Sequence, residues 1–425
     1  MTSDRSATPA LGWTRLTCYA LFGLPLAMVA LPIYVYLPQF YALRSGLPLG
    51  AIGAVLLAAR LCAAFTDPLL GWWIERGGGY ARPLALALPM LLLGFGALFH
   101  PPALGTAAVL VWFLLALLLV YLGFGLATIA HQSWGAALTQ AVAGRAKVTA
   151  LREGCGLLGV MLAAGLTGWR GYDALSLAFA VLLPATALLL LRAPRPSPPA
   201  AIPAAASQPG LSWAGVLAPF GGAPFRCLFA VLLVNGVAGA IPATLFLFFV
   251  DDRLRLGSYA GPFLMLYFGA AALSMPLWVT LARRFGEARA WSGGMLLAAA
   301  VFVWAFGVAP GPGAAAGFGV ICLLSGLTLG ADLALPPALL AGVIAAAGHG
   351  GRREAAYFGW WNWGVQINLA LAAGIALPLL GALGYVPGRD GAAGTATLAA
   401  AYALLPCALK LLAAFMLWRA PLRQC

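Results

Sequence analysis

The stretch TAAVLVWFLLALLLVYLGFGLATIA, residues 106–130, contains no charged side chain and no proline. A helix needs about 20 apolar residues to cross a bilayer, so this stretch predicts a transmembrane helix. Comparable apolar segments lie on both sides of it and predict an all-α polytopic membrane protein with twelve spans. The expected spans are residues 15–41, 51–75, 83–100, 106–137, 148–169, 173–191, 224–250, 259–282, 289–309, 314–345, 355–380 and 395–418.

Composition supports a membrane protein and argues against other classes. The chain is 63% hydrophobic and 8% charged, whereas soluble domains carry about 25% charged residues. The net charge of +13 could indicate nucleic acid, but no basic block is interleaved with aromatic residues, so we expect the lipid bilayer and no nucleic acid as partner. Seven scattered cysteines form no metal motif, and no nucleotide-binding or hydrolase motif occurs, so we expect neither an enzyme nor a cofactor.

Basic residues predict the orientation. The expected gaps on one side, with both termini, carry 17 Lys and Arg residues, and the gaps on the other side carry 5. Basic loops stay in the cytoplasm, so both termini are predicted to be cytoplasmic. The N-terminus has no signal-peptide pattern. We expect a multi-pass protein of a bacterial-type inner, or plasma, membrane.

The two halves of the chain resemble each other. Asp67-Pro68-Leu69 followed by Arg76 matches Met275-Pro276-Leu277 followed by Arg284, at a constant offset of 208 residues. Two parallel six-helix halves are typical of the major facilitator fold, with a central cavity that opens alternately to each side. We expect the halves at residues 1–192 and 224–425, joined by a cytoplasmic linker, 193–223, whose Pro, Ala and Ser content predicts no helix.

One segment carries a family resemblance. The sequence ARLCAAFTDPLLG, residues 59–71, resembles the helix 2 signature of the glycoside-pentoside-hexuronide:cation symporters, the melibiose carrier-like family. Further matches follow in order along both halves. They are Trp134-Gly135-Ala136, Arg152-Glu153-Gly154, Gly330-Ala331-Asp332, Gly351-Arg352-Arg353 and Tyr357-Phe358-Gly359.

The resemblance implies a cation-coupling site on the second span. Asp67 matches the acid that helps to bind the cation, and Arg60 matches its structural and gating partner. We add Thr66 and Thr128 as candidate ligands. A carboxylate inside the membrane costs at least about 2.5 kcal/mol, so Asp67 must face a cavity, a partner or a cation. The alternative is that Asp67 pins a neighbouring helix while Arg60 reaches the membrane interface.

Departures from the family pattern bear on the ion. Ala63 stands where sodium-coupled members carry a second acid, and Gln366 stands where they often carry a lysine. A lone buried carboxylate accepts a proton more readily than it coordinates sodium, which prefers several oxygens. The coupling ion is therefore H⁺ or Na⁺, with H⁺ favoured.

Other polar and aromatic residues inside the spans are candidates for the substrate cavity. Each type of candidate also has a purely structural alternative. His131 would then be hydrogen-bonded between helices, and a tryptophan would lie at the membrane interface. Arg152 would form an ion-pair lock with Glu153. Asp332 precedes Pro336-Pro337, which we expect to break its helix, so a gating or packing role is an equal alternative to ligand binding for this acid. The candidates are His131, Gln132, Trp134, Arg152, Asp332, Trp361, Asn362 and Gln366.

Charged residues in the predicted cytoplasmic gaps recur at equivalent places in both halves. They suit salt bridges that close the cytoplasmic side, although the positive-inside rule alone also explains the arginines. The gate candidates are Glu75, Arg76, Arg82, Glu153, Arg284 and Glu287.

Together these features predict a secondary active transporter, expected to be a monomer. The first hypothesis is cation-coupled symport of a sugar or related small solute by alternating access. Leu24 and Pro25 occupy the positions of the family's charged sugar ligands, so a lysolipid or other amphiphile is the alternative cargo. A membrane sensor or scaffold that does not transport is the third hypothesis, but it gives no reason to keep Asp67 in the membrane.

Overall fold

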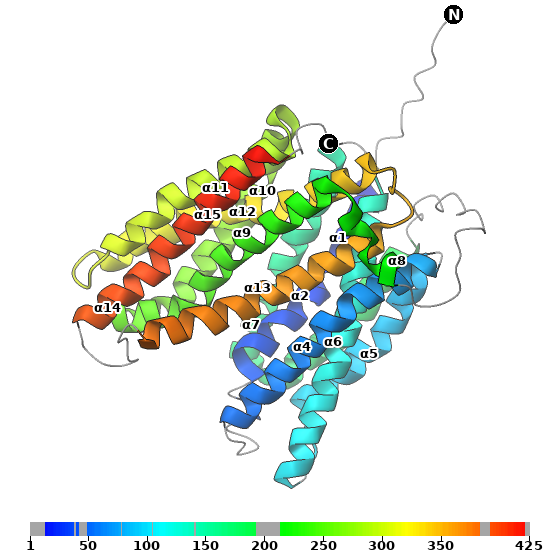
Figure 1. The fold of residues 1–425 in the computed structure, drawn as a ribbon. Helices are drawn as coiled ribbons and strands as arrows, with labels where there is room; N and C mark the ends of the chain where they lie inside the picture. The colour runs from blue at the N-terminus through cyan, green and yellow to red at the C-terminus, as the bar shows by residue number, and fades with distance from the viewer. Residues whose placement is uncertain are drawn as a thin grey trace, which may run out of the picture.

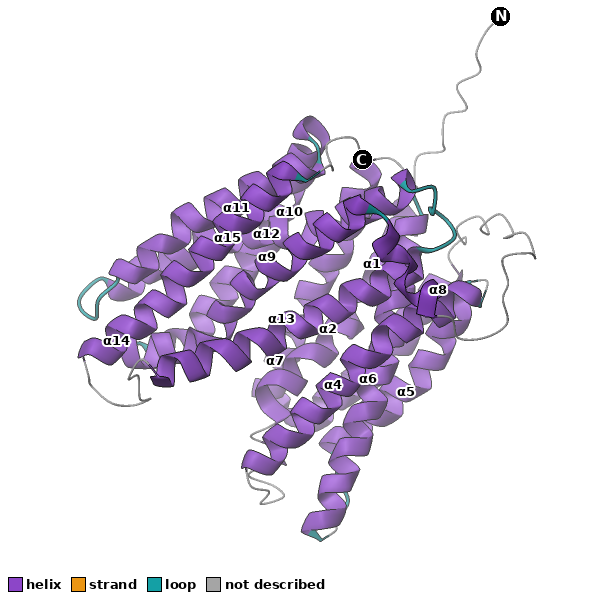
Figure 2. Cartoon of the chain, in the orientation of Figure 1, coloured by secondary structure: helices purple, strands orange, loops and turns teal. Residues whose placement is uncertain are grey.

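The computed structural model describes residues 13–37, 40–41, 49–77, 79–103, 105–139, 142–192, 213–382 and 392–420. These residues form helices and connecting turns without any β-strand (Figure 2). Eleven segments among them are long and apolar enough to cross a membrane. The 29-residue helix α13, Glu354–Ala382, occupies the place of the remaining expected span. The prediction of an all-α polytopic protein is confirmed.

The first half begins with a span made of three short pieces. Its elements are α1 (Trp13–Leu21), α2 (Gly23–Leu31), η1 (Pro32–Tyr36), α4 (Leu49–Arg76), α5 (Ala81–Phe99), α6 (Thr106–Ala137) and α7 (Val142–Arg192). Helix α7 contains two spans, because the chain reverses at Gly171, whose φ of 78° and ψ of −171° are not helical. A positive φ of this size favours glycine.

The second half repeats this arrangement of spans. Its elements are α9 (Ala223–Phe248), η4 (Phe249–Arg253), η5 (Gly257–Tyr259), α10 (Ala260–Phe285), α11 (Glu287–Phe302), η6 (Val303–Gly307), α12 (Ala314–Ala346), α13, α14 (Ala392–Ala399), η7 (Ala400–Leu404) and α15 (Leu405–Arg419). Helix α12 continues through Pro336 and Pro337, so the expected break is wrong. Proline in a membrane helix is tolerated where neighbours or local adjustments satisfy the freed backbone groups.

The predicted linker is partly helical. Residues 193–212 lie outside the described residues, but α8 (Trp213–Leu217) and η3 (Ala218–Gly221) form in the segment for which no helix was expected. Tertiary contacts explain the difference, since Trp360 of α13 donates a hydrogen bond to the Val216 carbonyl oxygen at 2.8 Å. Helix propensity alone is a weak guide for so short a segment.

The two halves meet at one end of the bundle. Figure 1 shows them together near α8 and diverging toward the opposite end. We call this meeting place the linker end, which comprises α8, the C-terminal end of α4 and the N-terminal ends of α7, α11 and α13. Here the backbones of α4 and α13 lie in direct contact. A Cβ atom at Gly71 would overlap the Ala355 carbonyl oxygen, and one at Gly359 would lie 2.7 Å from the Asp67 carbonyl oxygen. Small residues allow such contacts between membrane helices.

A valine at Gly71 is expected to force the linker end open. The opposing atom is backbone and cannot rotate away, so overpacking should cost about 1–3 kcal/mol. A cysteine at Thr149, a buried position between the halves, should then react with an impermeant maleimide about fivefold faster or more, in a protein whose native cysteines are replaced by serine. The control is Gly53→Val on the same helix, where a Cβ meets no atom within 4 Å. Equal labelling of the two variants would contradict this account.

Candidate functional site

Asp67 is buried in α4 without a polar partner. Its side chain is 2% exposed, and no described residue donates a hydrogen bond to the carboxylate or forms an ion pair with it. A Cβ at Gly125 of α6 would lie 2.5 Å from Oδ1, with a Leu70 methyl group 3.4 Å away from the same point. An unpartnered carboxylate in such surroundings is strongly disfavoured while ionised.

The other cation-coupling candidates do not gather around Asp67. Arg60 is half-buried on the same helix and makes no ion pair with that carboxylate. Thr66 donates its hydroxyl to the Ala63 carbonyl oxygen at 3.0 Å, within its own helix. The Thr128 hydroxyl on α6 is buried and has no hydrogen-bond partner among the described residues. Their roles in cation coupling stay predictions.

Asp332 has the opposite environment from Asp67. Its Oδ1 accepts hydrogen bonds from Trp291 Nε1 at 2.8 Å and Asn235 Nδ2 at 3.2 Å. Its Oδ2 lies 2.6 Å from Lys410 Nζ, which also donates to Asn235 Oδ1 at 3.0 Å. These residues come from α12, α11, α9 and α15. The sequence analysis missed Lys410, although it is a lone charge in an apolar run.

His131 and Trp134 are parts of the interior of the first half. The His131 ring is 1% exposed, and its Nε2 lies 2.8 Å from the Tyr19 carbonyl oxygen. The ring also contacts the aromatic rings of Tyr19 and Phe22, with centroids 4.3 and 5.1 Å away. Trp134 is buried, with its ring 6.4 Å from that of Tyr80. This geometry matches the alternative in which His131 is hydrogen-bonded between helices.

A small cavity lined by both polar and apolar side chains lies where the halves meet. Its volume is about 10 Å³, room for roughly one water molecule. Arg152, buried in α7, donates to the neighbouring Glu153 through Nε at 3.1 Å and through Nη2. Glu153 therefore pairs within α7, and the structure shows no ion pair from it to the other half among the described residues. The lining residues are Tyr19, Gln132, Gly135, Ala136, Arg145, Val148, Thr149, Arg152, Pro337, Ala341 and Phe358.

Three of the cavity candidates lie on α13. Trp361 is buried, Asn362 is half-buried, and the Gln366 Oε1 atom is buried without a hydrogen-bond partner in the part of the chain that the structure describes. On α6, which contacts α13, the Gln132 Oε1 atom is likewise unpartnered. Both amide oxygens can accept a hydrogen bond from a hydroxyl group.

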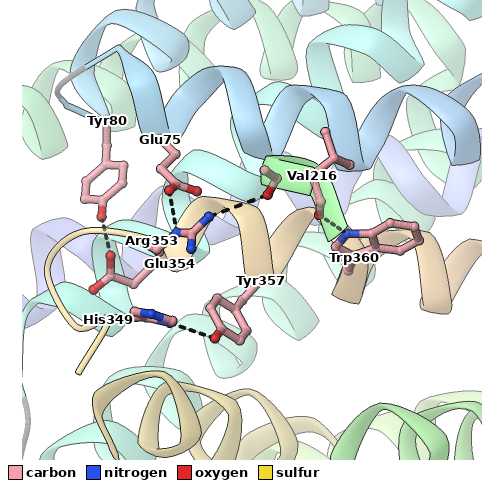
Figure 3. Close-up of polar contacts among 9 residues, drawn as sticks. Glu75, Tyr80, Val216, His349, Arg353, Glu354, Tyr357 and Trp360 are labelled. Atoms are coloured by element: carbon pink, nitrogen blue, oxygen red, sulfur yellow. Dashed lines mark hydrogen bonds and ion pairs between the residues drawn. The ribbon is translucent and has the colours of Figure 1, made fainter. Parts of the chain in front are cut away.

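The linker end is joined by an ion pair across the halves. Figure 3 shows Arg353, the residue before α13, directed toward Glu75 at the end of α4, with Nε and Oε1 2.7 Å apart. Arg353 Nη2 also reaches the Gly215 carbonyl oxygen of α8 at 3.5 Å. Beside this pair, Tyr80 donates its hydroxyl to Glu354 Oε2 at 3.1 Å. Burial, reinforced by the Glu354 carboxylate, raises the pKa of Tyr80 well above its usual value, so the phenol stays a donor.

A second ion pair crosses the halves at an equivalent place. Arg145 at the start of α7 lies 3.6 Å from Glu287 at the start of α11, and both side chains are buried. Arg145 and Arg353 are 208 positions apart, the offset already seen between the halves. Each arginine thus pairs with an acid from the other half. The offset could have identified both arginines from the sequence.

The arginines predicted for the gate are not members of these two ion pairs. The Arg76 guanidinium lies over the Trp72 ring, 4.2 Å from its centroid, and the Arg284 guanidinium lies 5.5 Å from the centroid of the neighbouring Phe285 ring. Arg82 is exposed. Glu75 and Glu287 are therefore the predicted gate residues that the structure brings into contact across the halves.

Comparison with known proteins now places the chain in a class. The model of the family described as MFS/sugar transport protein matches residues 18–424. The chain therefore belongs to this family of major facilitator transporters, and it is a transporter rather than an enzyme. The family resemblance found in the sequence is confirmed at this level.

One curated relative is the uncharacterized symporter YjmB of Bacillus subtilis (strain 168). It is 26% identical over 133 residues, which cover 30% of this chain and 29% of the relative. The match thus spans less than a third of that protein's length.

Solved structures confirm the major facilitator fold. A bacterial homologue of the iron transporter ferroportin, in an outward-facing state, has a TM-score of 0.73 at 15% identity, covering 96% of this chain and 98% of that one. The E. coli fucose:proton symporter has a TM-score of 0.68 at 15% identity over 95% and 98% of the chains. The proton:xylose symporter has a TM-score of 0.66 at 15% identity, over 96% and 94%.

Removing the Glu75 charge is expected to shift the linker end toward an open state. Glu75→Gln leaves the largely buried Arg353 guanidinium without its counter-charge, and we expect about a tenfold shift after allowing for its partial exposure. Spin labels at Gly79→Cys and Ala347→Cys, exposed positions on opposite halves, would report longer distances. The double swap Glu75→Arg with Arg353→Glu should shorten them again, and Arg284→Gln should change nothing. No change in Glu75→Gln would contradict the gate.

Acid is expected to favour opening of the same end through His349. Its Nδ1 lies 2.8 Å from the Tyr357 hydroxyl, and burial, together with nearby Arg353, lowers the pKa of His349 below its ordinary 6.5. The closed state therefore binds fewer protons than a state in which His349 meets water, so closure weakens as pH falls below about 6.5. The same spin-label distances, measured at several pH values, should show a smaller acid-induced shift in His349→Gln than in the wild type. An unchanged shift would rule His349 out as the sensor.

Proposed function

We propose that the protein is a cation-coupled symporter that moves a sugar or related small polar solute by alternating access, with H⁺ as the coupling ion. The observation that carries this proposal is Asp67, a membrane-embedded carboxylate without a partner among the described residues. A charge in that position is expensive, so binding a proton there is favourable. A structural acid would instead be expected to have donors, as Asp332 has.

The surroundings of Asp67 support a proton over sodium. Sodium needs several oxygen ligands, whereas the carboxylate lies against Gly125 and close to Leu70. No group of three or more His, Cys, Asp or Glu side chains is placed to hold a metal ion in the described residues. A proton needs only the carboxylate itself.

Asp67 is connected to the gate through one helix. Its carbonyl oxygen lies at the Gly359 contact, and Glu75 lies two turns further along α4. Protonation of Asp67 removes the charge from this segment of α4. Because the same segment carries the contacts that close the linker end, the charge state of Asp67 can bias closure.

The interface between the halves suits a hydroxylated solute. Gln132 and Gln366 keep amide oxygens without partners in the described part of the chain. Arg152, a side chain with several donors, lines the same small cavity as Gln132. The cavity holds roughly one water molecule in this state. A sugar would therefore reach these groups from the end of the bundle opposite the linker end, where the two halves diverge. From the positive-inside pattern we infer that the linker end lies on the cytoplasmic side of a bacterial-type inner membrane.

Uptake into proteoliposomes tests the proposal. Radiolabelled glycosides, pentoses, hexuronides and a lysolipid are offered under an imposed proton or sodium gradient. We expect a sugar to accumulate with the proton gradient. Asp67→Asn, which mimics the protonated acid, should lose accumulation down to about the equilibrium level while still exchanging sugar. Asp173→Asn, whose carboxylate is 91% exposed, is the matched control.

Each other outcome would change a defined part of the proposal. Accumulation driven by sodium alone would overturn the ion. Movement of lysolipid but no sugar would overturn the cargo. Proton-driven accumulation that survives in Asp67→Asn would remove Asp67 from the coupling site.

A further inference from the structure

Four helices of the second half meet at one ion pair. Asp332 of α12 and Lys410 of α15 are joined by Asn235 of α9 and Trp291 of α11, and every contact is between 2.6 and 3.2 Å. The two charged side chains are 19% and 13% exposed. Their charges cancel, and the carboxylate accepts hydrogen bonds at both oxygens.

The ion pair lies at a weak point of α12. Pro336 has no N–H group to donate to the carbonyl oxygen four residues earlier, which belongs to Asp332, and Pro337 likewise leaves that of Leu333. Two backbone hydrogen bonds are therefore lost beside the pair, yet α12 remains helical from Ala314 to Ala346. Side-chain contacts at Asp332 hold the helix where its backbone bonding is weakest.

The segment that follows the prolines makes contact with the other half. Pro337 and Ala341 line the interface cavity beside Arg152. A Cβ at Gly342 would lie 2.8 Å from Arg145 Nη2, the guanidinium that pairs with Glu287. The direction of α12 beyond Pro337 thus determines how closely Arg145 and the cavity are covered.

We propose that Lys410 is a positioning residue: through Asp332 it fixes the proline-containing part of α12, so that residues 337–342 close over Arg145 and Arg152 of the first half. The pair acts as a neutral tie among four helices. Its charges serve each other and bind neither the coupling ion nor the solute. For Asp332 this favours the gating or packing role over the substrate contact, the two alternatives that the sequence left open.

The energetics of buried ion pairs give a clear test. Removing one partner leaves the other charge uncompensated in the membrane, whereas replacing both by neutral groups of similar size is often tolerated. If the Asp332–Lys410 pair only ties the helices together, replacing both residues should therefore restore what replacing one of them loses. If either residue instead binds the ion or the solute directly, the protein with both residues replaced would remain defective in transport.

The variants are Asp332→Asn, Lys410→Met and the double variant. The single variants should lower the midpoint of thermal unfolding and raise maleimide labelling of Thr149→Cys by about tenfold. The double variant should return both readouts to within about threefold of the wild type, or to within a few degrees for the midpoint. Asp173→Asn is again the control for loss of an exposed acid.

Uptake provides a second readout, which rests on the proposed function. The single variants should lose maximal uptake rate about tenfold with little change in KM, and the double variant should recover the rate with the wild-type pH profile. A double variant as defective as either single, or one with a raised KM, would overturn the tie and indicate direct contact with ion or solute. Wild-type behaviour of both single variants would also overturn it. If the wild type transports no sugar, the proposed function fails, but thermal unfolding and maleimide labelling still test whether Lys410 and Asp332 position α12. The failure of one proposal can therefore be distinguished from the failure of the other.

Discussion

The backbone contact between α4 and α13 is the constraint on which the rest of the arrangement depends. Two membrane helices can approach so closely only where neither carries a side chain, and Gly71 and Gly359 provide those positions. The contact brings Glu75 within 2.7 Å of Arg353. It also places the Asp67 backbone at the boundary between the halves. Packing at two glycines therefore sets both the ion pair and the position of the buried acid.

Duplication of the six-helix unit explains why the linker end is closed twice. Arg145 and Arg353 occupy the same place in the two halves, and each pairs with an acid from the other half. The two pairs differ in their support. The Arg353 pair is close, with a 2.7 Å contact, and also contacts α8, whereas Arg145 and Glu287 are 3.6 Å apart. Because the linker exists only once, α8 supports one of two otherwise equivalent contacts.

The sequence predicted what local chemistry determines. Apolar length located the spans to within a few residues, because lipid demands about 20 apolar residues whatever the partner. Asp67 was identified because an ionised side chain within an apolar span is costly and must face a cavity, a partner or a cation. The partners were not predictable in the same way: Arg353 is 278 residues from Glu75. Helix α8 was missed because a contact distant in sequence supports it, the hydrogen bond from Trp360 of α13. The continuity of α12 through two prolines likewise depends on neighbouring helices.

The two membrane acids show how surroundings separate residues that look alike in sequence. Each precedes a proline inside a span, and each is costly to bury. Asp332 offsets that cost with an ammonium group and two further donors from three other helices. Asp67 has no comparable donor among the described residues, which is why the proposed proton site is Asp67 and not Asp332. In the proposed symport the two acids therefore have different parts: Asp67 is the acid whose charge changes, and Asp332 is the acid whose bonds hold its helix in place while that change occurs.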